Sequence, residues 1–444
     1  MSKNLHHYDT LYYNLITRKK LYKRCLKMKT IGIIAEFNPF HNGHKYLIDK
    51  CKKDLHADRV VVVMSGDYVQ RGAPAIIDKF TRAKCAISLG ADLVIELPVY
   101  YSLGSAEYFA KGAISILSGL GCIDYLCFGS EFPDVNKLYE ISDIISKEPP
   151  VYKDVLSTCL KDGLSFPAAR AKALNEQLKS TSKGYDQAEY EELLSSPNTI
   201  LGIEYLRALN TKNRFITPYA VQRVGRPFHS EELGSIPSAA GIRARLLSGL
   251  SDRVKLNAPF ILDGVMPRTS IESISSYEGR FMQSNDYSAF LEYKLILEKT
   301  EGYTKYLDVT RDISNRIIAN LEHIDGYSSF CNLLKTKNLV YTRISRCLMH
   351  ILLNITEENM KQYKDDDFTA YARVLALKST SSDLLKVISE NGSIPVLNRL
   401  KDADKMLSPL QKQLFDETLI ASQIYNALSC NGISSEYSLK QIVL

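Results

Sequence analysis

Four consecutive residues, His41, Asn42, Gly43 and His44, have types and a spacing that suggest chemistry. They follow a short apolar run, residues 31–34, that predicts a buried strand, and they open an amphipathic run that predicts a helix. A helix start offers unpaired backbone N–H groups and a positive dipole end, so it can hold an anion, and Gly43 lets a phosphate approach the backbone. The two imidazoles could donate hydrogen bonds to a phosphate whose charge grows in a transition state.

The same histidine pair has two other interpretations. Two histidines beside a glycine also occur in ordinary loops that have no catalytic role, and four residues alone do not exclude this interpretation. Residues three apart also share a helix face and could bind a metal. No nearby Cys or His completes a ligand set, which disfavours zinc.

The elements around these residues predict an α/β fold. Strands expected at residues 31–34, 59–65, 91–98, 124–128 and 215–221 alternate with amphipathic helices, and a helical insertion is expected at about 134–196. Such alternation predicts a parallel sheet, whose ligand site lies beyond the carboxyl ends of its strands, where the strand order reverses. The histidine loop and Gly129 would then face each other, although Gly129 could equally be a turn that ends its strand.

The string NPFHNGH resembles the HxGH signature of the nucleotidyltransferase superfamily, whose members bind ATP in a doubly wound α/β domain. The longer string EFNPFHNGH, and the chain from Lys29 onward, resemble the bacterial tRNA(Met) cytidine acetate ligase family. The resemblance implies a five-stranded, nucleotidyltransferase-like (HUP-type) domain at residues 29–250, with His41 and His44 as its catalytic residues.

Further ATP contacts are implied by the same resemblance. Asn198 lies in an SPN motif, although an Asn there is also a common helix cap. The family usually has a basic residue where this chain has Gln222, so Arg223 is the expected phosphate partner. The superfamily motif ISSTxIR here reads IPSAAGIR, so a second phosphate clamp would depend on Ser238 and Arg243, whose guanidinium suits phosphate geometry. The complete set of expected ATP contacts is Ile34, Ala35, Glu36, Phe37, Asn38, Pro39, Phe40, His41, Asn42, Gly43, His44, Gly129, Asn198, Gln222, Arg223, Ser238 and Arg243. Gln70 and Arg71, in the family-like stretch SGDYVQRGAPA, are weaker candidates for substrate contact.

Beyond the α/β region, residues 251–285 are rich in Ser, Pro and Gly and predict a linker or an elaborated loop. Residues 286–444 predict an all-helical domain. Its basic side chains could form a solvated helix flank or follow an RNA backbone. A TRxxR helix similar to the family's favours tRNA binding, with Lys335, Lys337, Arg343 and Arg346 as expected contacts. Arg373 is a further expected tRNA contact, in the separate family-like stretch YARVLALK, although it could instead cap a neighbouring helix. His350 is expected on the same helix face as Arg343 and Arg346.

Charge, cysteine content and hydrophobicity bear on whether the protein binds nucleic acid, which compartment it occupies and whether it spans a membrane. The net charge of +6 comes entirely from residues 1–28, which hold seven Lys or Arg residues against one Asp, so any nucleic-acid site elsewhere must be a local patch. This basic segment is expected to be a dispensable extension or, alternatively, an RNA-touching arm. The nine cysteines form no close metal pair and predict free thiols in a reducing cytoplasm, and no apolar run is long enough to span a membrane.

The resemblance implies an ATP-dependent ligase. Acetate and ATP, with Mg²⁺ bridging the phosphates, would give acetyladenylate and pyrophosphate. The acetyl group would then pass to N4 of the wobble cytidine of elongator tRNA(Met), giving N4-acetylcytidine, with no covalent enzyme intermediate and no membrane or DNA partner. The alternatives are a small-molecule nucleotidyltransferase that adenylylates a phosphorylated metabolite, and a non-catalytic RNA-binding protein, which the intact HxGH motif disfavours.

Overall fold

The computed structural model describes residues 28–181, 186–213, 215–223, 238–249, 251–430, 435–439 and 441–444, without side chains at 251–253. The expected basic extension, residues 1–28, lies outside this part of the chain except for Met28. No helix in the described ranges is both long and apolar enough to cross a membrane.

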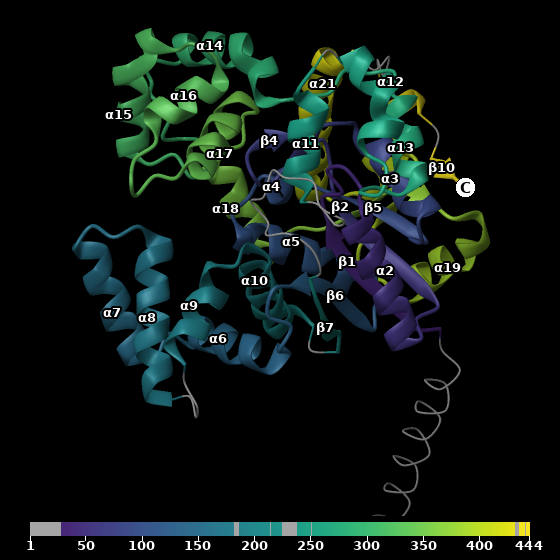
Figure 1. The fold of residues 1–444 in the computed structure, drawn as a ribbon, viewed down its shortest axis with the longest axis horizontal. Coiled ribbons are helices and arrows are strands. Elements are labelled where there is room, and N and C mark those ends of the chain that lie inside the picture. Colours follow the sequence, from purple (N-terminus) through teal and green to yellow (C-terminus); the bar gives the residue numbers. More distant parts are fainter. Residues whose placement is uncertain are drawn as a thin grey trace, which may run out of the picture.

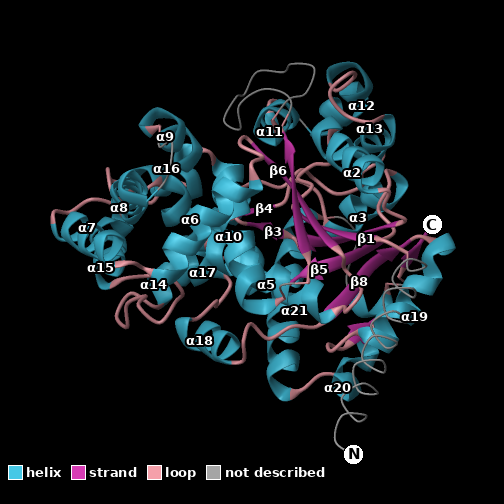
Figure 2. Ribbon diagram, turned by 90° about the horizontal axis from the view of Figure 1, so that it is seen from below, coloured by secondary structure: helices cyan, strands magenta, loops and turns pink. Residues whose placement is uncertain are grey.

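One twisted sheet organises the described chain (Figures 1 and 2). Its path runs β10 (Ile442–Val443), β8 (Ala372–Leu377), β5 (Leu93–Leu97), β2 (Arg59–Ser65), β1 (Thr30–Ala35), β6 (Tyr125–Ser130), β7 (Thr217–Gln222). The five strands from β5 to β7 are mutually parallel, which confirms the predicted doubly wound sheet. The chain passes from β1 to β2 and β5, then returns to β6 and β7 on the other side of β1, so the strand order reverses between β1 and β6.

Alternating side chains give the sheet two apolar faces. In β2, Val60, Val62 and Met64 join one buried cluster, whereas Val61 and Val63 join another. Helices α2 (Asn42–Leu55) and α3 (Lys79–Ser88) cover the first face, and α5 (Ala106–Gly119) and α10 (Pro197–Lys212) cover the second. Helices on both faces are what a parallel sheet requires, because neither face can be left in water.

Residues 134–196 form the predicted helical insertion, which lies at the lower left in Figure 1. Its helices are α6 (Val135–Lys147), α7 (Pro150–Lys161), α8 (Phe166–Thr181) and α9 (Gln187–Ser195). The remaining short elements near the sheet are β3 (Tyr68–Val69), β4 (Ala73–Pro74), α4 (Val99–Ser102) and α11 (Ala239–Leu247).

The expectation of a linker at residues 251–285 is wrong. This segment forms α12 (Ser251–Ile261) and α13 (Arg268–Ser275), whose apolar side chains share a cluster with Ile76 and Ile77. Pro259 lies inside α12, so the Ser, Pro and Gly content that predicted a loop did not prevent a helix. Burial against the α/β region overrides the weak local propensity.

The C-terminal region is mainly helical, as predicted. Its helices are α14 (Ser288–Leu297), α15 (Arg311–Asn320), α16 (Tyr327–Leu334), α17 (Tyr341–Leu352), α18 (Glu357–Asp365), α19 (Ser382–Asn391), α20 (Ala403–Met406) and α21 (Pro409–Ser429). Single 3-10 turns occur at Ser284–Tyr287, Leu321–His323, Ser379–Ser381, Leu400–Asp402 and Glu436–Ser438.

The same region also returns to the sheet, which the sequence did not predict. Strand β8 pairs antiparallel with β5, and β9 (Val396–Leu397) and β10 pair with β8. All six residues of β8 are buried, and a short apolar run of this kind cannot be assigned to strand or helix from periodicity. Residues of α17 and α21 share one apolar cluster with α5 and α10, so the two halves of the chain have a common core.

Candidate active site

A cavity of about 210 Å³ lies beyond the carboxyl ends of β1 and β6, where the strand order reverses. The expected ATP residues that line it come from the end of β1, the start of α2, β6, α10 and the end of β7. They are Ile34, Ala35, Glu36, Phe37, Asn38, His41, Gly43, His44, Gly129, Asn198, Gln222 and Arg223. The fold therefore brings these residues together around one hollow.

The two histidines cap α2. His41 is the N-cap residue, and its Nδ1 accepts a hydrogen bond of 3.0 Å from the backbone N–H of Gly43. His44 reaches back, and its Nδ1 accepts a 3.2 Å hydrogen bond from the backbone N–H of His41. This is the reciprocal arrangement of a capping box, made here by two imidazoles, and it explains the spacing of three between them.

The predicted phosphate-binding amides are occupied within the protein. The N–H of Gly43 donates to His41, that of His44 to the carbonyl oxygen of His41, and that of Asn42 to the carbonyl oxygen of Val265. The expectation of unpaired amides at this helix start is therefore wrong, because the imidazoles and the α12–α13 connection take them. These three amides of α2 are therefore not free to hold an anion in the cavity.

Both imidazoles are neutral at physiological pH. Burial, and then the positive charges of Arg223 and Arg243, lower the pKa of His41 to about 3. Burial, followed by the neighbouring His41, also lowers the pKa of His44 well below its usual value. Because each Nδ1 accepts a backbone hydrogen bond, the single proton of each neutral ring lies on Nε2. The rings stack with their centroids 3.8 Å apart, so each of two adjacent rings carries one Nε2–H donor.

The loop before α2, residues 36–40, is fixed by hydrogen bonds and aromatic contacts with other parts of the chain. Asn38 is buried, its Oδ1 accepts from the N–H of Ile76 at 2.8 Å, and its carbonyl oxygen accepts from Nη1 of Arg243 at 2.8 Å. Phe37 and Phe40 are also buried and contact the His44 ring, with centroids 4.9 and 5.5 Å away. Pro39 lies next to Asn38 in the same turn. Phe40 and Pro39 therefore support the histidines from behind and do not line the cavity.

A polar cluster borders the opposite side of the cavity. The Glu131 carboxylate accepts from Nδ2 of Asn198 at 2.7 Å and from Nη1 of Arg223 at 3.3 Å, and its carbonyl oxygen accepts from Gln222. Gly129 lies beside this cluster, and a Cβ there would be 3.3 Å from Cγ of Arg223. Glu131 was absent from the predicted contacts, and its position directly after the Gly129 strand end is the signal that could have found it.

The second predicted phosphate clamp, Ser238 and Arg243, lies next to the cavity and does not line it. Ser238 caps α11 by accepting from the N–H of Gly241 at 3.1 Å, and it is buried. Arg243, one turn into α11, has its pKa lowered to about 10, first by burial. Neither residue lines the cavity, whereas Ala239 beside Ser238 does. Arg243 reaches the site through the Asn38 carbonyl group.

Gln70 and Arg71, the weaker candidates, both line the cavity. They lie in the turn between β3 and β4, and the N–H of Gln70 donates to Oε1 of Glu36 at 2.9 Å. Apolar lining residues that sequence reasoning missed are Phe109, Phe128, Leu201 and Tyr205, together with Tyr46 and Leu47. Their types match ordinary core positions, so nothing in the sequence alone distinguished them.

The expected tRNA contacts separate into two groups. Lys335 and Lys337 are exposed before α17, and Arg343 is partly exposed on its first turn. Arg346 is more enclosed, and burial lowers its pKa. These four remain candidates for RNA contact.

The structure contradicts the expected tRNA contact at Arg373. Its side chain is only 3 % exposed and lies in β8, where it forms ion pairs with Glu96, at 2.7 Å, and Glu436. It cannot reach RNA without unfolding the sheet edge. His350 is also fully buried, with Nδ1 2.8 Å from the carbonyl oxygen of Leu307 and Nε2 3.1 Å from that of Leu103. Helical periodicity predicted an exposed helix face for His350, and the structure buries it. At Arg373 the sequence predicted a helix, and the structure forms strand β8.

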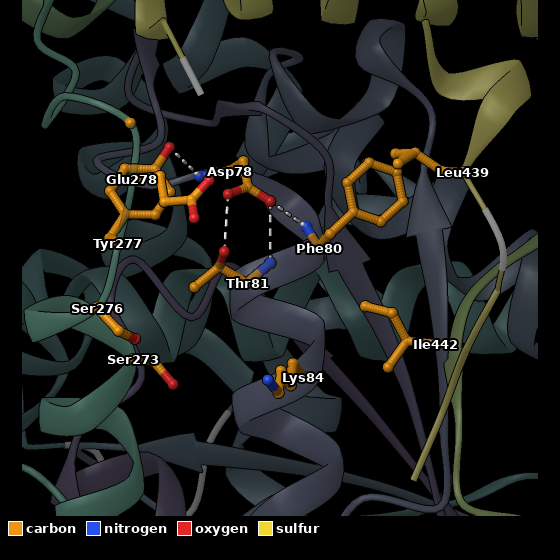
Figure 3. Close-up of a pocket in the computed structure, with 11 residues that line it drawn as sticks. Asp78, Phe80, Thr81, Lys84, Ser273, Ser276, Tyr277, Glu278, Leu439 and Ile442 are labelled. Atoms are coloured by element: carbon orange, nitrogen blue, oxygen red, sulfur yellow. Dashed lines mark hydrogen bonds between the residues drawn. The ribbon is translucent and has the colours of Figure 1, made fainter. Parts of the chain in front are cut away.

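A second hollow, of about 370 Å³, lies between α3, α13 and the C-terminal residues (Figure 3). Its buried carboxylate, Asp78, accepts from the N–H groups of Phe80 and Thr81 and from the Thr81 hydroxyl group. Tyr277 accepts from the N–H of Asp78. These groups cap α3, so they are already paired within the protein. Among the described residues, no three His, Cys, Asp or Glu side chains gather as a metal site.

Known proteins resemble this chain along most of its length. The model of the HIGH Nucleotidyl Transferase family matches residues 28–438. The tRNA(Met) cytidine acetate ligase of Acetivibrio thermocellus is 38% identical over 404 residues, which are 90% of this chain and 94% of that protein. That of Clostridium perfringens is 34% identical over 419 residues, covering 94% of this chain and 100% of the relative.

Two crystal structures of Thermotoga maritima TmcAL are also similar. The apo form I superposes with a TM-score of 0.85 at 26% identity, and the form bound with alpha-thio ATP superposes with a TM-score of 0.82 at 27% identity. Each match covers 94% of this chain and all of the other chain. The chain therefore belongs to the HIGH nucleotidyl transferase family and, within it, to the tRNA(Met) cytidine acetate ligases, which are enzymes of the ligase class.

Proposed function

We propose that the cavity beyond β1 and β6 binds ATP and that the enzyme joins acetate to it, forming acetyladenylate, before acetylating N4 of the wobble cytidine of elongator tRNA(Met). Acetate and the tRNA are proposed as substrates from the names of the relatives. The nucleotide is proposed from the alpha-thio ATP bound in the Thermotoga maritima structure. One observation on this chain carries the proposal: two stacked imidazoles line the cavity, and the Nδ1 of each accepts a backbone hydrogen bond, which leaves Nε2–H as the donor.

In the first step an acetate oxygen attacks the α-phosphorus of ATP, and the bond from that phosphorus to the bridging oxygen breaks to release pyrophosphate. Negative charge grows on the α-phosphate and on the leaving group. His41 and His44 donate to phosphate oxygens, and donors fixed before the reaction stabilise such charge without reorganising. Neutral donors are suited to this task because burial, which lowers both pKa values, does not remove the Nε2 protons.

Arginine supplies the positive charge that the neutral histidines lack. Arg223 lies at the cavity beside Glu131, and Arg71 also lines the cavity. A triphosphate would compete with Glu131 for Arg223, because guanidinium groups bind phosphate in a bidentate way. Asn198, held by the same carboxylate, is proposed to contact the nucleotide.

Mg²⁺ is proposed to enter with the nucleotide. Among the described residues that line the cavity, Glu36 supplies a carboxylate. Mg²⁺ is usually held by phosphate oxygens, water and one or two carboxylates, so a single Glu fits this pattern. It would supply charge neutralisation of the β- and γ-phosphates.

In the second step the N4 amine of cytidine attacks the acetyl carbonyl carbon, the carbon–oxygen bond to AMP breaks, and the amine loses a proton. Lys335, Lys337, Arg343 and Arg346 are proposed to hold the tRNA backbone. A wobble base lies in a loop and can be turned out of its stack into a cavity.

The test is acetate-dependent exchange of labelled pyrophosphate into ATP, with and without tRNA. We expect exchange that requires acetate and falls about a hundredfold in His44→Ala, the typical effect of removing one such donor. His56→Asn, at the exposed end of the same helix, is the matched control and should retain full exchange. Exchange supported by other small substrates and not by acetate would contradict the ligase and favour the metabolite nucleotidyltransferase.

A further inference from the structure

The turn that carries Gln70 and Arg71 touches a helix from the other half of the chain. Strands β3 and β4 pair antiparallel, and the turn between them, residues 70–72, packs against α17. The hydroxyl group of Ser345 donates a 2.7 Å hydrogen bond to the carbonyl oxygen of Gly72. Ser345 is 1% exposed, so this contact is shielded from water.

Gly72 is required by both its backbone angle and its neighbours. Its φ is +77°, a conformation that costs an L-residue about 1–2 kcal/mol. A Cβ at this position would lie 2.4 Å from the backbone nitrogen of Arg346 and 2.6 Å from the carbonyl carbon of Ser345. Both are backbone atoms of a helix, so a side chain here would separate the turn from α17.

The other side of the same turn forms the cavity. The N–H of Gln70 donates to Oε1 of Glu36 at 2.9 Å, and Gln70 and Arg71 line the cavity with His41 and His44. Within three consecutive residues the chain therefore contacts α17, through Gly72, and borders the proposed nucleotide site, through Gln70 and Arg71.

Helix α17 is itself held firmly against the α/β region. Its His350 lies between the carbonyl oxygens of Leu103, after α4, and Leu307. The hydroxyl group of Tyr327 donates to the carbonyl oxygen of Ser345 at 2.7 Å, which ties α17 to α16. The helix thus provides a fixed surface against which the turn can be placed.

We propose that Gly72 is a positioning residue, through which α17 sets Gln70 and Arg71 at the nucleotide cavity. The proposal rests on the proposed function only for the identity of the nucleotide, ATP. Because α17 also carries Arg343, the turn joins the proposed RNA-binding helix directly to the site of adenylate formation.

The test compares Gly72→Ala with Gly163→Ala. Gly163 has a φ of +80° and no atom within 4 Å of its virtual Cβ, so alanine there has the same backbone cost without the collision. ATP affinity is measured by calorimetry without acetate or tRNA, which keeps this result separate from the test of ligase chemistry. We expect Gly72→Ala to raise the Kd for ATP about tenfold, the effect of disturbing one or two hydrogen bonds to a charged ligand, and Gly163→Ala to leave it unchanged.

A steady-state measurement separates positioning from general loss of structure. Gly72→Ala should raise the KM for ATP more than it lowers kcat at a temperature where thermal unfolding shows the variant to be folded. A fall in kcat in proportion to the folded fraction, with KM unchanged, would overturn the proposal. So would equal ATP affinity in the two alanine variants.

Ser345→Ala provides the decisive variant if Gly72→Ala does not fold. It removes the hydroxyl donor to Gly72 and adds no atom, and it should raise the Kd for ATP about threefold. An unchanged Kd in a folded Ser345→Ala variant would show that α17 does not place the turn.

Discussion

Nη1 of Arg82 lies 2.7 Å from the carbonyl oxygen of Glu36, the residue at which the chain leaves β1 for the histidine loop. The same guanidinium donates to the carbonyl oxygens of Ser65, at 3.0 Å, and Gly66, where the chain leaves β2. Its Nε donates to Ile77 at 3.0 Å. One buried arginine therefore joins the carboxyl ends of the two central strands.

Replacing Arg82 with lysine should damage both stability and the site. An ammonium group is compact and cannot reach four carbonyl oxygens at once, so several would be left buried without a donor. We expect Arg82→Lys to lower the free energy of unfolding by about 3 kcal/mol and to weaken ATP binding. Urea unfolding and calorimetry measure the two effects. Lys84→Ala, at an exposed position of the same helix, should change stability by no more than about 0.5 kcal/mol.

The role of Arg82 also shows where sequence reasoning stops. The α/β order and the HxGH loop follow from local signals: short apolar strands, a breaking Asn38 and a glycine at a helix start. The helical spacing of Ile76, Phe80, Ala83 and Ile87 predicts an apolar helix face, and Arg82 lies off that face, so the sequence pattern suggests a solvated side chain. Its burial depends on the ends of β1 and β2, which are distant in sequence.

The occupied amides of α2 show a second limit. The spacing of His41 and His44 correctly indicated a helix start, but it could not show that the imidazoles cap that helix. Nor could it show that Val265, more than two hundred residues later, takes the N–H of Asn42. Long-range contacts also turned the expected linker into α12 and α13. The sequence thus predicted which residues meet better than how their polar groups are paired.

Arg373 is expected to stabilise the fold and not to bind tRNA. Together with Lys79 it neutralises the buried carboxylates of Glu96 and Glu436, with Lys79 Nζ 2.7 and 3.0 Å from these two partners. Burial alone would raise the pKa of Glu436, but Lys79 and Arg373 outweigh it and hold that pKa below its usual value. Removing one partner of a buried ion pair costs about 3–5 kcal/mol. Arg373→Gln should therefore lower thermal stability strongly, while tRNA affinity of the folded variant, measured by filter binding, stays unchanged.

The surface cations should behave in the opposite way. Lys335, Lys337 and Arg343 lie at or near the surface beside α17, so replacing them with glutamine should leave the unfolding temperature nearly unchanged. If they contact phosphates, each replacement should reduce the slope of log affinity against log salt by about 1. Filter binding over a range of salt concentrations measures this slope. Binding with an unchanged slope in the triple variant would place the tRNA elsewhere on the protein.

The buried histidines should make the protein less stable in mild acid. The pKa of His41 falls from its ordinary 6.5 to about 3 on folding, so between these values the unfolded chain binds a proton that the folded chain does not. Stability must then rise with pH across this window and be lost as pH falls through it, by about 1.4 kcal/mol per pH unit for one such group. His41→Asn keeps an oxygen acceptor at the N-cap and removes the titrating ring, so its stability should fall less steeply than that of the natural protein. Urea unfolding at closely spaced pH values measures both curves, with the exposed His56→Asn as the control for losing a histidine. Equal slopes for His41→Asn and the natural protein would mean that folding does not lower the pKa of His41, and that burial does not hold this imidazole neutral as the proposed chemistry requires.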